Sequence, residues 1–347
     1  MGADNTPAHD WRSAFSVYTR PRVVGMVFLG FAAGLPFLLV FTTLSAWLTK
    51  SGVDRTTIGF FSWIGITYSI KFFWAPVVDR LPLPLLTRVF GKRRSWMLVA
   101  QLGIAIGLCG MALTDPGLNL TQLALFALLV AFGSATQDIT IDAYRIEAVD
   151  RDLQGAMAAS YVLGYRLALL TAGAGALHLA NLTSWTMTYL SMAGLMAIGM
   201  LTTLVIREPQ HRPDRRASEI EARLEQTVGV QGRSSPLARL VAWLSDAVVS
   251  PFVEFFQRSG SMAVLILLLV GCYKLSDITM GVMANPFYID LGFGLDEIAN
   301  VTKVFGFFMT IAGAALGGLL VARYGILPPL LAGAILVAST NLLFVWL

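Results

Sequence analysis

Charged residues are scarce in this 347-residue chain, where aspartate, glutamate, lysine and arginine together make up only 13% of the sequence. A soluble domain carries about 25% charged residues, whereas this chain is 56% hydrophobic and has a mean hydropathy of +0.69. The shortage of charge excludes an ordinary soluble domain and favours a protein that lies largely within lipid.

Cysteine and histidine are rare as well, with 2 and 3 copies. Cys109 and Cys272 fall within apolar runs, so they are interpreted as small apolar side chains, and no disulfide framework is predicted. The histidines are scattered at His9, His178 and His211, and the sequence has no His-Glu-x-x-His motif, Gly-x-Ser-x-Gly turn or phosphate-binding loop. We therefore expect a protein that is not an enzyme and that uses no metal or cofactor.

Long apolar runs, by contrast, recur along the whole chain. A helix that spans a bilayer needs about 20 mostly apolar residues. Windows of this kind lie at 23–48, 57–78, 96–113, 119–147, 155–180, 185–206, 261–288, 298–322 and 326–347. The sequence therefore predicts an all-α, polytopic membrane protein with about nine transmembrane helices.

The distribution of lysine and arginine predicts the orientation of these helices. With a cytoplasmic N-terminus, 19 of the 25 basic residues fall in cytoplasmic segments, and only Lys50 and Arg55 fall outside. This asymmetry follows the positive-inside rule, and anionic lipid head groups account for the net charge of +4 without any nucleic acid. The predicted segments are a cytoplasmic tail at 1–22, a six-helix half at 23–206, a cytoplasmic linker with an amphipathic helix at 207–260, and an incomplete second half at 261–347.

Two helical halves joined by a cytoplasmic linker are the plan of major facilitator transporters, whose second helix ends in a G-x-x-x-D-R-x-G-R-R motif. Here APVVDR matches that motif at Asp79 and Arg80, and GLLVARYG keeps Arg323 in the second half. A carboxylate near arginines at helix ends can close a cytoplasmic gate through charge-assisted hydrogen bonds, and we assign these three residues to such a gate. The remaining basic residues of the loop are interpreted as positive-inside anchors: Lys92, Arg93 and Arg94.

Further motifs match one family along the whole chain. They are GFAAGLP (30–36), AWLTKSGVDRTTIGFFS (46–62), KFFWAPVVDR (71–80), GKRRSW (91–96), SATQDITIDAYR (134–145), YVLGYR (161–166), YKLSDITMG (273–281) and PFYIDLGFGLDEIANVTKVFG (286–306). In these motifs the chain resembles the AmpG-type muropeptide permeases, which have acetyl-CoA transporters as relatives. The resemblance implies proton-dependent import of peptidoglycan fragments across the bacterial inner membrane, for wall recycling and β-lactamase induction.

Two other functions stay open at this point. One is a major facilitator carrier for another solute, such as a sugar, a drug or an acyl-CoA. The other is a truncated fragment that does not transport, because a facilitator with two six-helix halves has about 12 helices and we expect this chain to lack the end of its second half. In either carrier function we expect a monomer that binds a small solute and protons.

Ionisable residues within the predicted spans indicate a polar pathway, since each costs about 2.5–3.5 kcal/mol to insert. These residues are Lys71, Asp138, Asp142, Arg166, Lys274, Asp277 and Lys303. The alternative is that they form buried ion pairs that only fix the register of the helices. Their occurrence on several helices favours the pathway.

The stretch SATQDITIDAYR contains Asp138, Asp142 and Arg145 at positions i, i+4 and i+7, so all three share one helix face. Gln137 and Tyr144 flank this face. Two carboxylates one turn apart in a medium of low dielectric constant cannot both ionise cheaply, which suits a residue that carries a coupling proton.

The next predicted helix supplies Tyr161, Tyr165 and Arg166. We expect Arg166 to compensate one of the carboxylates, while the tyrosines suit the hydroxyl groups and apolar ring faces of a sugar. Lys71, Arg166 or Lys274 could bind the lactyl or peptide carboxylates of a substrate. The candidates from the second half are Lys274, Asp277 and Lys303.

The orientation can be tested by labelling single cysteines from outside the cell. We expect the reagent to miss cysteines placed at Ser218 and Ser234 and to reach cysteines at Asn119 and Asp296, because the positive-inside rule assigns the first pair to the cytoplasm. Labelling at Ser218 in intact cells would reverse the orientation.

Overall fold

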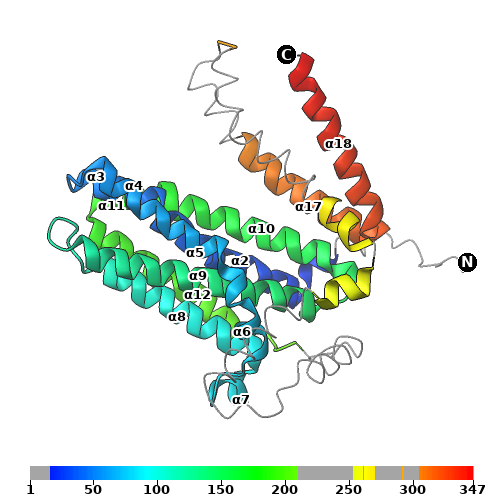
Figure 1. Ribbon diagram of the computed structural model, residues 1–347, viewed down its shortest axis with the longest axis horizontal. Coiled ribbons are helices and arrows are strands. Elements are labelled where there is room, and N and C mark those ends of the chain that lie inside the picture. The colour runs from blue at the N-terminus through cyan, green and yellow to red at the C-terminus, as the bar shows by residue number, and fades with distance from the viewer. Residues whose placement is uncertain (1–15, 210–252, 261, 270–290, 293–304, 347) are drawn as a thin grey trace, which may run out of the picture. The chain divides into compact units, whose positions relative to one another are not determined.

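The computed structural model describes residues 16–209, 253–260, 262–269, 291–292 and 305–346, which are helical or irregular and contain no strand. Six helical segments among them are long and apolar enough to cross a membrane (Figure 1): Pro21–Lys50, Lys92–Ala112, Leu120–Ala148, Arg151–Leu182, Trp185–Val205 and Gly306–Tyr324. A shorter apolar stretch, Leu327–Thr340, lies within the last described helix, α18 (Leu327–Trp346). The prediction of an all-α polytopic protein is confirmed.

The chain divides into two compact units. The first contains Met1–Gln210 and Ile311–Leu331, and the second contains His211–Thr310 and Ala332–Leu347. The predicted boundaries of the linker and of the second half stay predictions. Of the predicted span at 261–288 only 262–269 is described, as a helical stretch, and most of the predicted amphipathic helix lies outside the described residues.

Three of the predicted spans are single helices with bounds close to those expected. They are α8 (Lys92–Ala112), α9 (Leu120–Ala148) and α12 (Trp185–Val205). Side-chain oxygens cap two of their N-termini: Asn119 accepts a hydrogen bond from the backbone N–H of Gln122 at 3.0 Å, and Ser184 accepts one from Met187 at 3.2 Å. Later in the chain, α17 (Gly306–Tyr324) overlaps the predicted span at 298–322 and ends two residues beyond it, and α18 (Leu327–Trp346) falls within the span at 326–347.

Two other spans are helical with an interruption. The first divides at Phe41 into α2 (Pro21–Val40) and α3 (Thr42–Lys50). The fifth contains α10 (Gln154–Leu170), a π-helical turn at Thr171–Gly175 and α11 (Ala176–Leu182). The π-helical turn leaves backbone carbonyls without regular partners, and the hydroxyl of Thr43 donates to the Ala172 carbonyl at 2.7 Å.

The predicted span at 57–78 is not one continuous helix, and this prediction is wrong. The segment forms five short pieces: α4 (Arg55–Phe61), η2 (Ser62–Gly65), α5 (Ile66–Ser69), η3 (Lys71–Phe73) and α6 (Ala75–Arg80). Gly59, Gly65 and several β-branched residues lower its helix propensity, and Pro76 cannot donate a backbone hydrogen bond. Hydropathy detected the span, but it could not detect the breaks.

Glycines let α2 and α10 pack with their backbones in contact. A Cβ atom at Gly30 would overlap the carbonyl of Tyr161, and one at Gly164 would overlap the carbonyl of Val27. Close approach at small residues is a common way for helices to associate in membranes, where no hydrophobic effect drives them together. This contact fixes the side chains of α10 in place beside α2.

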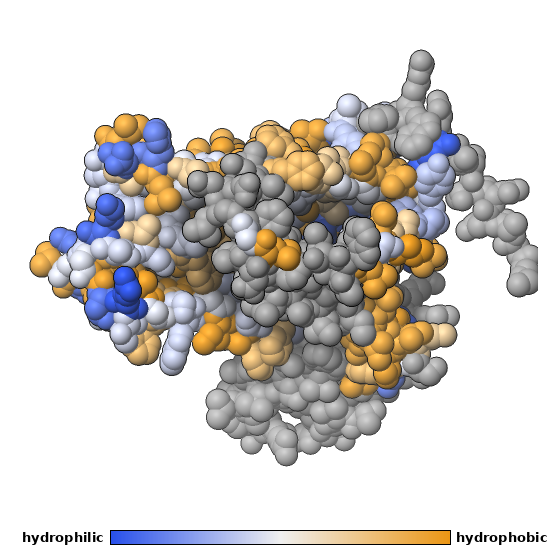
Figure 2. Space-filling view, turned by 90° about the horizontal axis from the view of Figure 1, so that it is seen from above, coloured by the Kyte–Doolittle hydropathy of each residue, from blue (hydrophilic) through white to orange (hydrophobic). Residues whose placement is uncertain are grey.

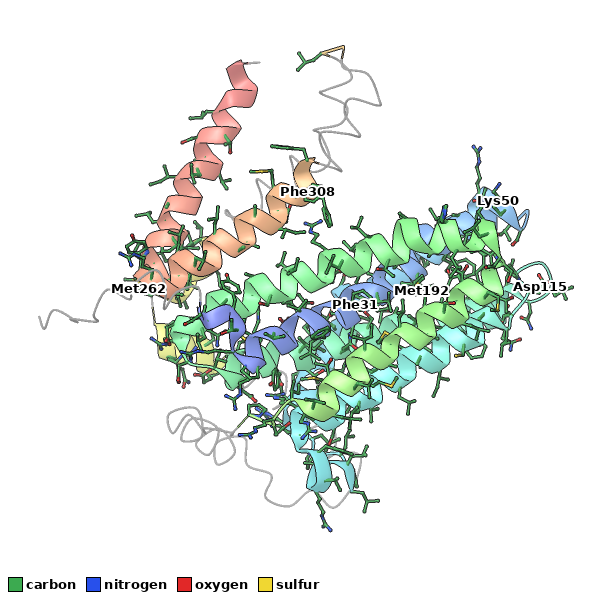
Figure 3. All side chains as sticks on the ribbon, turned by 180° about the vertical axis from the view of Figure 1, so that it is seen from behind. Phe31, Lys50, Asp115, Met192, Met262 and Phe308 are labelled. Carbon is green, nitrogen blue, oxygen red and sulfur yellow. The ribbon has the colours of Figure 1, made fainter. Side chains whose placement is uncertain are left out.

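The outer surface of the helices is apolar, as a membrane protein requires. Leu102, Ile106, Leu125 and Phe132 are exposed on α8 and α9, and Leu201 is exposed on α12. Figure 2 shows hydrophobic residues over the sides of the helices and hydrophilic residues gathered at the end that carries α3. Figure 3 shows Lys50 and Asp115 together at that end, as expected for two segments assigned to the outside.

The α2–α10 contact leads to a test with a matched pair of glycines. We expect Gly164→Ala to lower the free energy of unfolding by about 1–3 kcal/mol or more, because the new methyl group must displace the Val27 backbone. Gly194→Ala on α12 meets no atom within 4 Å, so its effect should stay within about 1 kcal/mol and be stabilising. Thermal unfolding in detergent measures both, and equal stability of the two variants would contradict the tight contact.

Candidate functional site

Asp138 lies within α9 and forms an ion pair with Lys71. The Lys71 Nζ is 3.7 Å from Asp138 Oδ2, and the aspartate side chain is 19% exposed. Its second oxygen, Oδ1, is buried and has no hydrogen-bond partner among the described residues. A direct charge-assisted hydrogen bond would be about 2.7–2.9 Å long, so the ion pair is loose and leaves the carboxylate half satisfied.

The broken segment places Lys71 opposite Asp138. Both α5 and η3 contact α9 (Figure 1). Directly after η3, the indole Nε1 of Trp74 donates to the Thr136 hydroxyl at 3.1 Å, and its ring lies 5.0 Å from the ring of Phe132. Trp74 thereby fastens η3 to α9, two residues before Asp138 along the helix.

Three tyrosines lie around the ion pair. Tyr161 and Tyr165 stand one turn apart on α10, with ring centroids separated by 5.9 Å, and the charge of Asp138 acts on both hydroxyls. The charge of Asp138 also acts on the hydroxyl of Tyr68, which belongs to α5 and lies near Ser134. Together they provide hydroxyl groups and flat apolar faces beside one acid and one base, a combination suited to a polar ring such as a sugar.

The expected cluster of Asp138, Asp142 and Arg145 separates into two ion pairs. The Arg145 Nη2 lies 3.2 Å from Asp142 Oδ1, and Asp142 is 52% exposed. Arg166, expected to compensate a carboxylate of α9, forms no ion pair with any described residue and lies near Tyr165 instead. Lys71 takes the place that sequence reasoning gave to Arg166.

Two other predicted residues point into the packed interior. Gln137 and Tyr144 are both 0% exposed, and Tyr144 belongs to a hydrophobic cluster with Met97 and Ile141. Neither amide atom of Gln137 has a partner among the described residues. Both residues are thus buried in the packed interior, and Tyr161 and Tyr165 pack against the cluster that contains Tyr144. Three further candidates lie outside the described residues: Lys274, Asp277 and Lys303.

A second cluster of charges joins the ends of three helices, α6, α8 and α9. Arg93 is only 6% exposed. Its guanidinium donates to Asp79 Oδ1 at 2.5 Å and to both carboxylate oxygens of Glu147 at 3.1 and 2.5 Å. Lys92 Nζ donates to the Asp79 backbone carbonyl at 2.6 Å. The paired geometry with Glu147 is the strong bidentate form of an arginine–carboxylate contact.

Glu208 closes this cluster from the end of α12. Its carboxylate accepts hydrogen bonds from the backbone N–H groups of Arg93 and Arg94, at 2.7 and 3.1 Å, which are free donors in the first turn of α8. Arg94 in turn donates to the carbonyls of Thr203 and Leu204. Gly91 before the helix has φ +86°, and a Cβ there would overlap Glu208.

The interpretation of Arg93 as a surface anchor is therefore wrong, and Glu147 and Glu208 were missed. The expectation that Asp79 lies near arginines at helix ends agrees with its contact with Arg93. One feature of the sequence could have identified Glu147: it lies at the end of the predicted helix, where a carboxylate needs a partner. Arg80 follows Asp79 at the end of α6, while Arg323 lies in the last turn of α17 with its guanidinium 5.3 Å from the ring of Tyr324.

An ion pair within a bundle of apolar helices, with a charge network at the helix ends, defines a multi-pass membrane protein built around an internal polar site. The family model described as Major Facilitator Superfamily matches residues 9–347. The Rickettsia conorii protein AmpG 4, named as a transporter, is 33% identical over 94% of this chain and 74% of its own length. The chain belongs to the major facilitator superfamily and, within it, to the AmpG-type family.

Two further known proteins are similar to this chain, to different degrees. The anhydromuropeptide permease of Escherichia coli strain K12 is 36% identical over 94% of this chain, and the chain spans only 60% of that relative. A solved structure of the proton:xylose symporter XylE, bound to 6-bromo-6-deoxy-D-glucose, has a TM-score of 0.48 and 11% identity, covering 91% of this chain and 70% of the symporter. This second likeness is too distant to support a conclusion.

The charge network can be tested with two arginines of the same region. Arg93→Gln removes the shared partner of Asp79 and Glu147, so we expect the free energy of unfolding to fall by about 1.5–3 kcal/mol. Arg88 is exposed, and Arg88→Gln should change the free energy by less than about 0.5 kcal/mol. Chemical or thermal unfolding of both variants is the measurement, and equal stabilities would show that the network contributes nothing.

Proposed function

We propose that this protein imports peptidoglycan fragments, the anhydromuropeptides, together with protons across the bacterial inner membrane, with its N-terminus in the cytoplasm. The observation that carries the proposal is the 36% identity to a permease named for this substrate, over 94% of the chain. Because the chain spans 60% of that relative, the activity of the whole transporter is inferred rather than established.

The central site supports a solute of this chemistry. A muropeptide combines sugar rings with carboxylates, and the site combines Tyr161 and Tyr165 with the cation of Lys71. Aromatic side chains bind the apolar faces of sugars, and tyrosine hydroxyls bond to their hydroxyl groups. A site for a wholly apolar solute would have no use for an ion pair within the membrane.

Asp138 is the carboxylate best placed to carry the coupling proton. It is mostly buried, its Oδ1 lacks a hydrogen bond, and its only cation among the described residues is a loosely held lysine. Asp142 is more exposed and has its own partner in Arg145. We therefore assign proton coupling to Asp138 and a supporting role to Asp142.

The network of Asp79, Arg93 and Glu147 would form part of the cytoplasmic gate. It ties the inner ends of α6, α8 and α9 together, so these helices would move as one body when access changes from one side to the other. Arg80 and Arg323 stay candidates for contacts that alternate between open and closed forms.

Uptake into energised membrane vesicles tests the function. With the unvaried protein we expect a labelled anhydromuropeptide to accumulate under an imposed proton gradient, and a labelled acyl-CoA not to accumulate. Collapse of the gradient with a protonophore should abolish accumulation. Uptake of the acyl-CoA alone would replace this proposal with a carrier for that solute.

Two aspartate variants then separate the proton site from its surroundings. Asparagine keeps the shape of aspartate but cannot titrate, so Asp138→Asn should lose uphill accumulation while exchange of labelled for unlabelled solute survives. Asp142→Asn should retain at least part of the uphill accumulation, because Asp142 lies outside the central pair. If both variants concentrate the solute with unchanged pH dependence, the proton site lies elsewhere.

A further inference from the structure

The Lys71–Asp138 pair is loose in a place where charge compensation is expensive. The atoms are 3.7 Å apart, Asp138 Oδ1 is unpaired among the described residues, and Lys71 is the more exposed of the two side chains at 36%. The lysine side chain thus contacts the carboxylate and stays partly accessible. A compact cation on a flexible stem can change partner with little rearrangement.

We propose that Lys71 binds a carboxylate of the transported solute, and that Asp138 competes for this lysine until it takes up a proton. This inference rests on the proposed function and deepens it by naming the solute class, an organic carboxylate, and its binding residue. In this exchange one proton adds to the Asp138 carboxylate, and the Lys71 ammonium stays charged. The solute carboxylate then replaces the aspartate as the counter-ion of Lys71.

Charge neutrality makes the two ligands depend on each other. The empty site holds Lys71 as a cation and Asp138 as an anion, and the loaded site holds the same cation, a neutral aspartic acid and the solute anion. Both states have a net charge of zero. A proton without the solute would leave an unpaired cation, and the solute without a proton would place two anions on one lysine, and both are costly within a membrane.

The other groups around the pair are a second ion pair, three neutral tyrosines and one further cation. On α9, Asp142 and Arg145 neutralise each other at 3.2 Å. On α5 and α10, Tyr68, Tyr161 and Tyr165 are neutral side chains that can bond to either form of the carboxyl. Arg166 on α10 lies beside Tyr165 and is the second cation that a solute with two carboxylates would meet.

Lys71 lies in a three-residue piece of helix, η3. Trp74, the residue that follows η3, fastens this piece to α9 through its hydrogen bond to Thr136. This anchor keeps Lys71 within reach of Asp138.

Binding to the purified full chain in detergent tests the inference, with a muropeptide that has free carboxylates and its carboxyl-methylated form as the two probes. For the unvaried protein at about pH 5.5 we expect the acid to bind about tenfold or more tighter than the ester, as a hydrogen bond to a charged group requires. Its affinity should fall by up to about tenfold per pH unit as Asp138 ionises, since binding takes up one proton. The ester should show no such dependence.

Two variants assign these effects to the pair. The Lys71→Met protein should bind the acid and the ester equally. The Asp138→Asn protein should prefer the acid at every pH and should take up no proton on binding. Calorimetry in buffers of different ionisation enthalpy measures this proton uptake. Lys50→Met removes a lysine that is exposed at the end of the helices (Figure 3) and should keep the ratio and the pH dependence of the unvaried protein. Thermal unfolding of each variant shows whether it folds. If Lys71→Met alone destabilises the protein, the double variant Lys71→Met with Asp138→Asn is used instead, because it removes both charges of the pair together.

The outcomes are distinct. A Lys71→Met protein that still prefers the acid by the same ratio, or an Asp138→Asn protein that still takes up a proton, overturns the exchange. Equal binding of acid and ester by the unvaried protein overturns it while leaving muropeptide transport intact. Absence of binding of either probe to the unvaried protein refutes the proposed function, and the inference falls with it.

Discussion

Charge within lipid needs an opposite charge, and this constraint organises the first six predicted spans. Born desolvation makes an isolated ion in a medium of low dielectric constant costly, so each buried cation must find an anion. Lys71 meets Asp138, Arg145 meets Asp142, and the buried Arg93 meets two carboxylates at once. The remaining interior is filled by apolar side chains and by glycines that let the backbones of α2 and α10 touch.

The helix α9 links the two polar regions. Asp138 and Glu147 are nine residues apart on it, which corresponds to about 13 Å along a helix axis. Near the end of α9, Glu147 accepts a hydrogen bond from Arg93, and further back along the helix Asp138 forms the ion pair with Lys71. The two polar regions therefore share one continuous helix.

The broken segment between Arg55 and Arg80 shows how low helix propensity can serve a membrane protein. A continuous helix would satisfy every backbone group within itself, and that is the usual solution in lipid. Irregular backbone is tolerated where it packs against protein, and here the short pieces contact α9, with Trp74 hydrogen-bonded to Thr136. The irregular backbone brings a lysine opposite an aspartate, which sequence spacing alone did not indicate.

The sequence alone determined the class of the protein, because hydropathy is a sum over residues and needs no knowledge of their neighbours. The apolar windows located α8, α9 and α12 closely, and local motifs identified the family and the region of Asp138 and Asp79. Tertiary structure decided which charges pair, because partners on different helices depend on rotation and depth that no local pattern encodes. Lys71 rather than Arg166 meets Asp138, Gln137 and Tyr144 turn into the core, and Arg93 is the buried centre of the second cluster. In each case the deciding factor was which helix packed against which face, and the desolvation of charge then selected the partner.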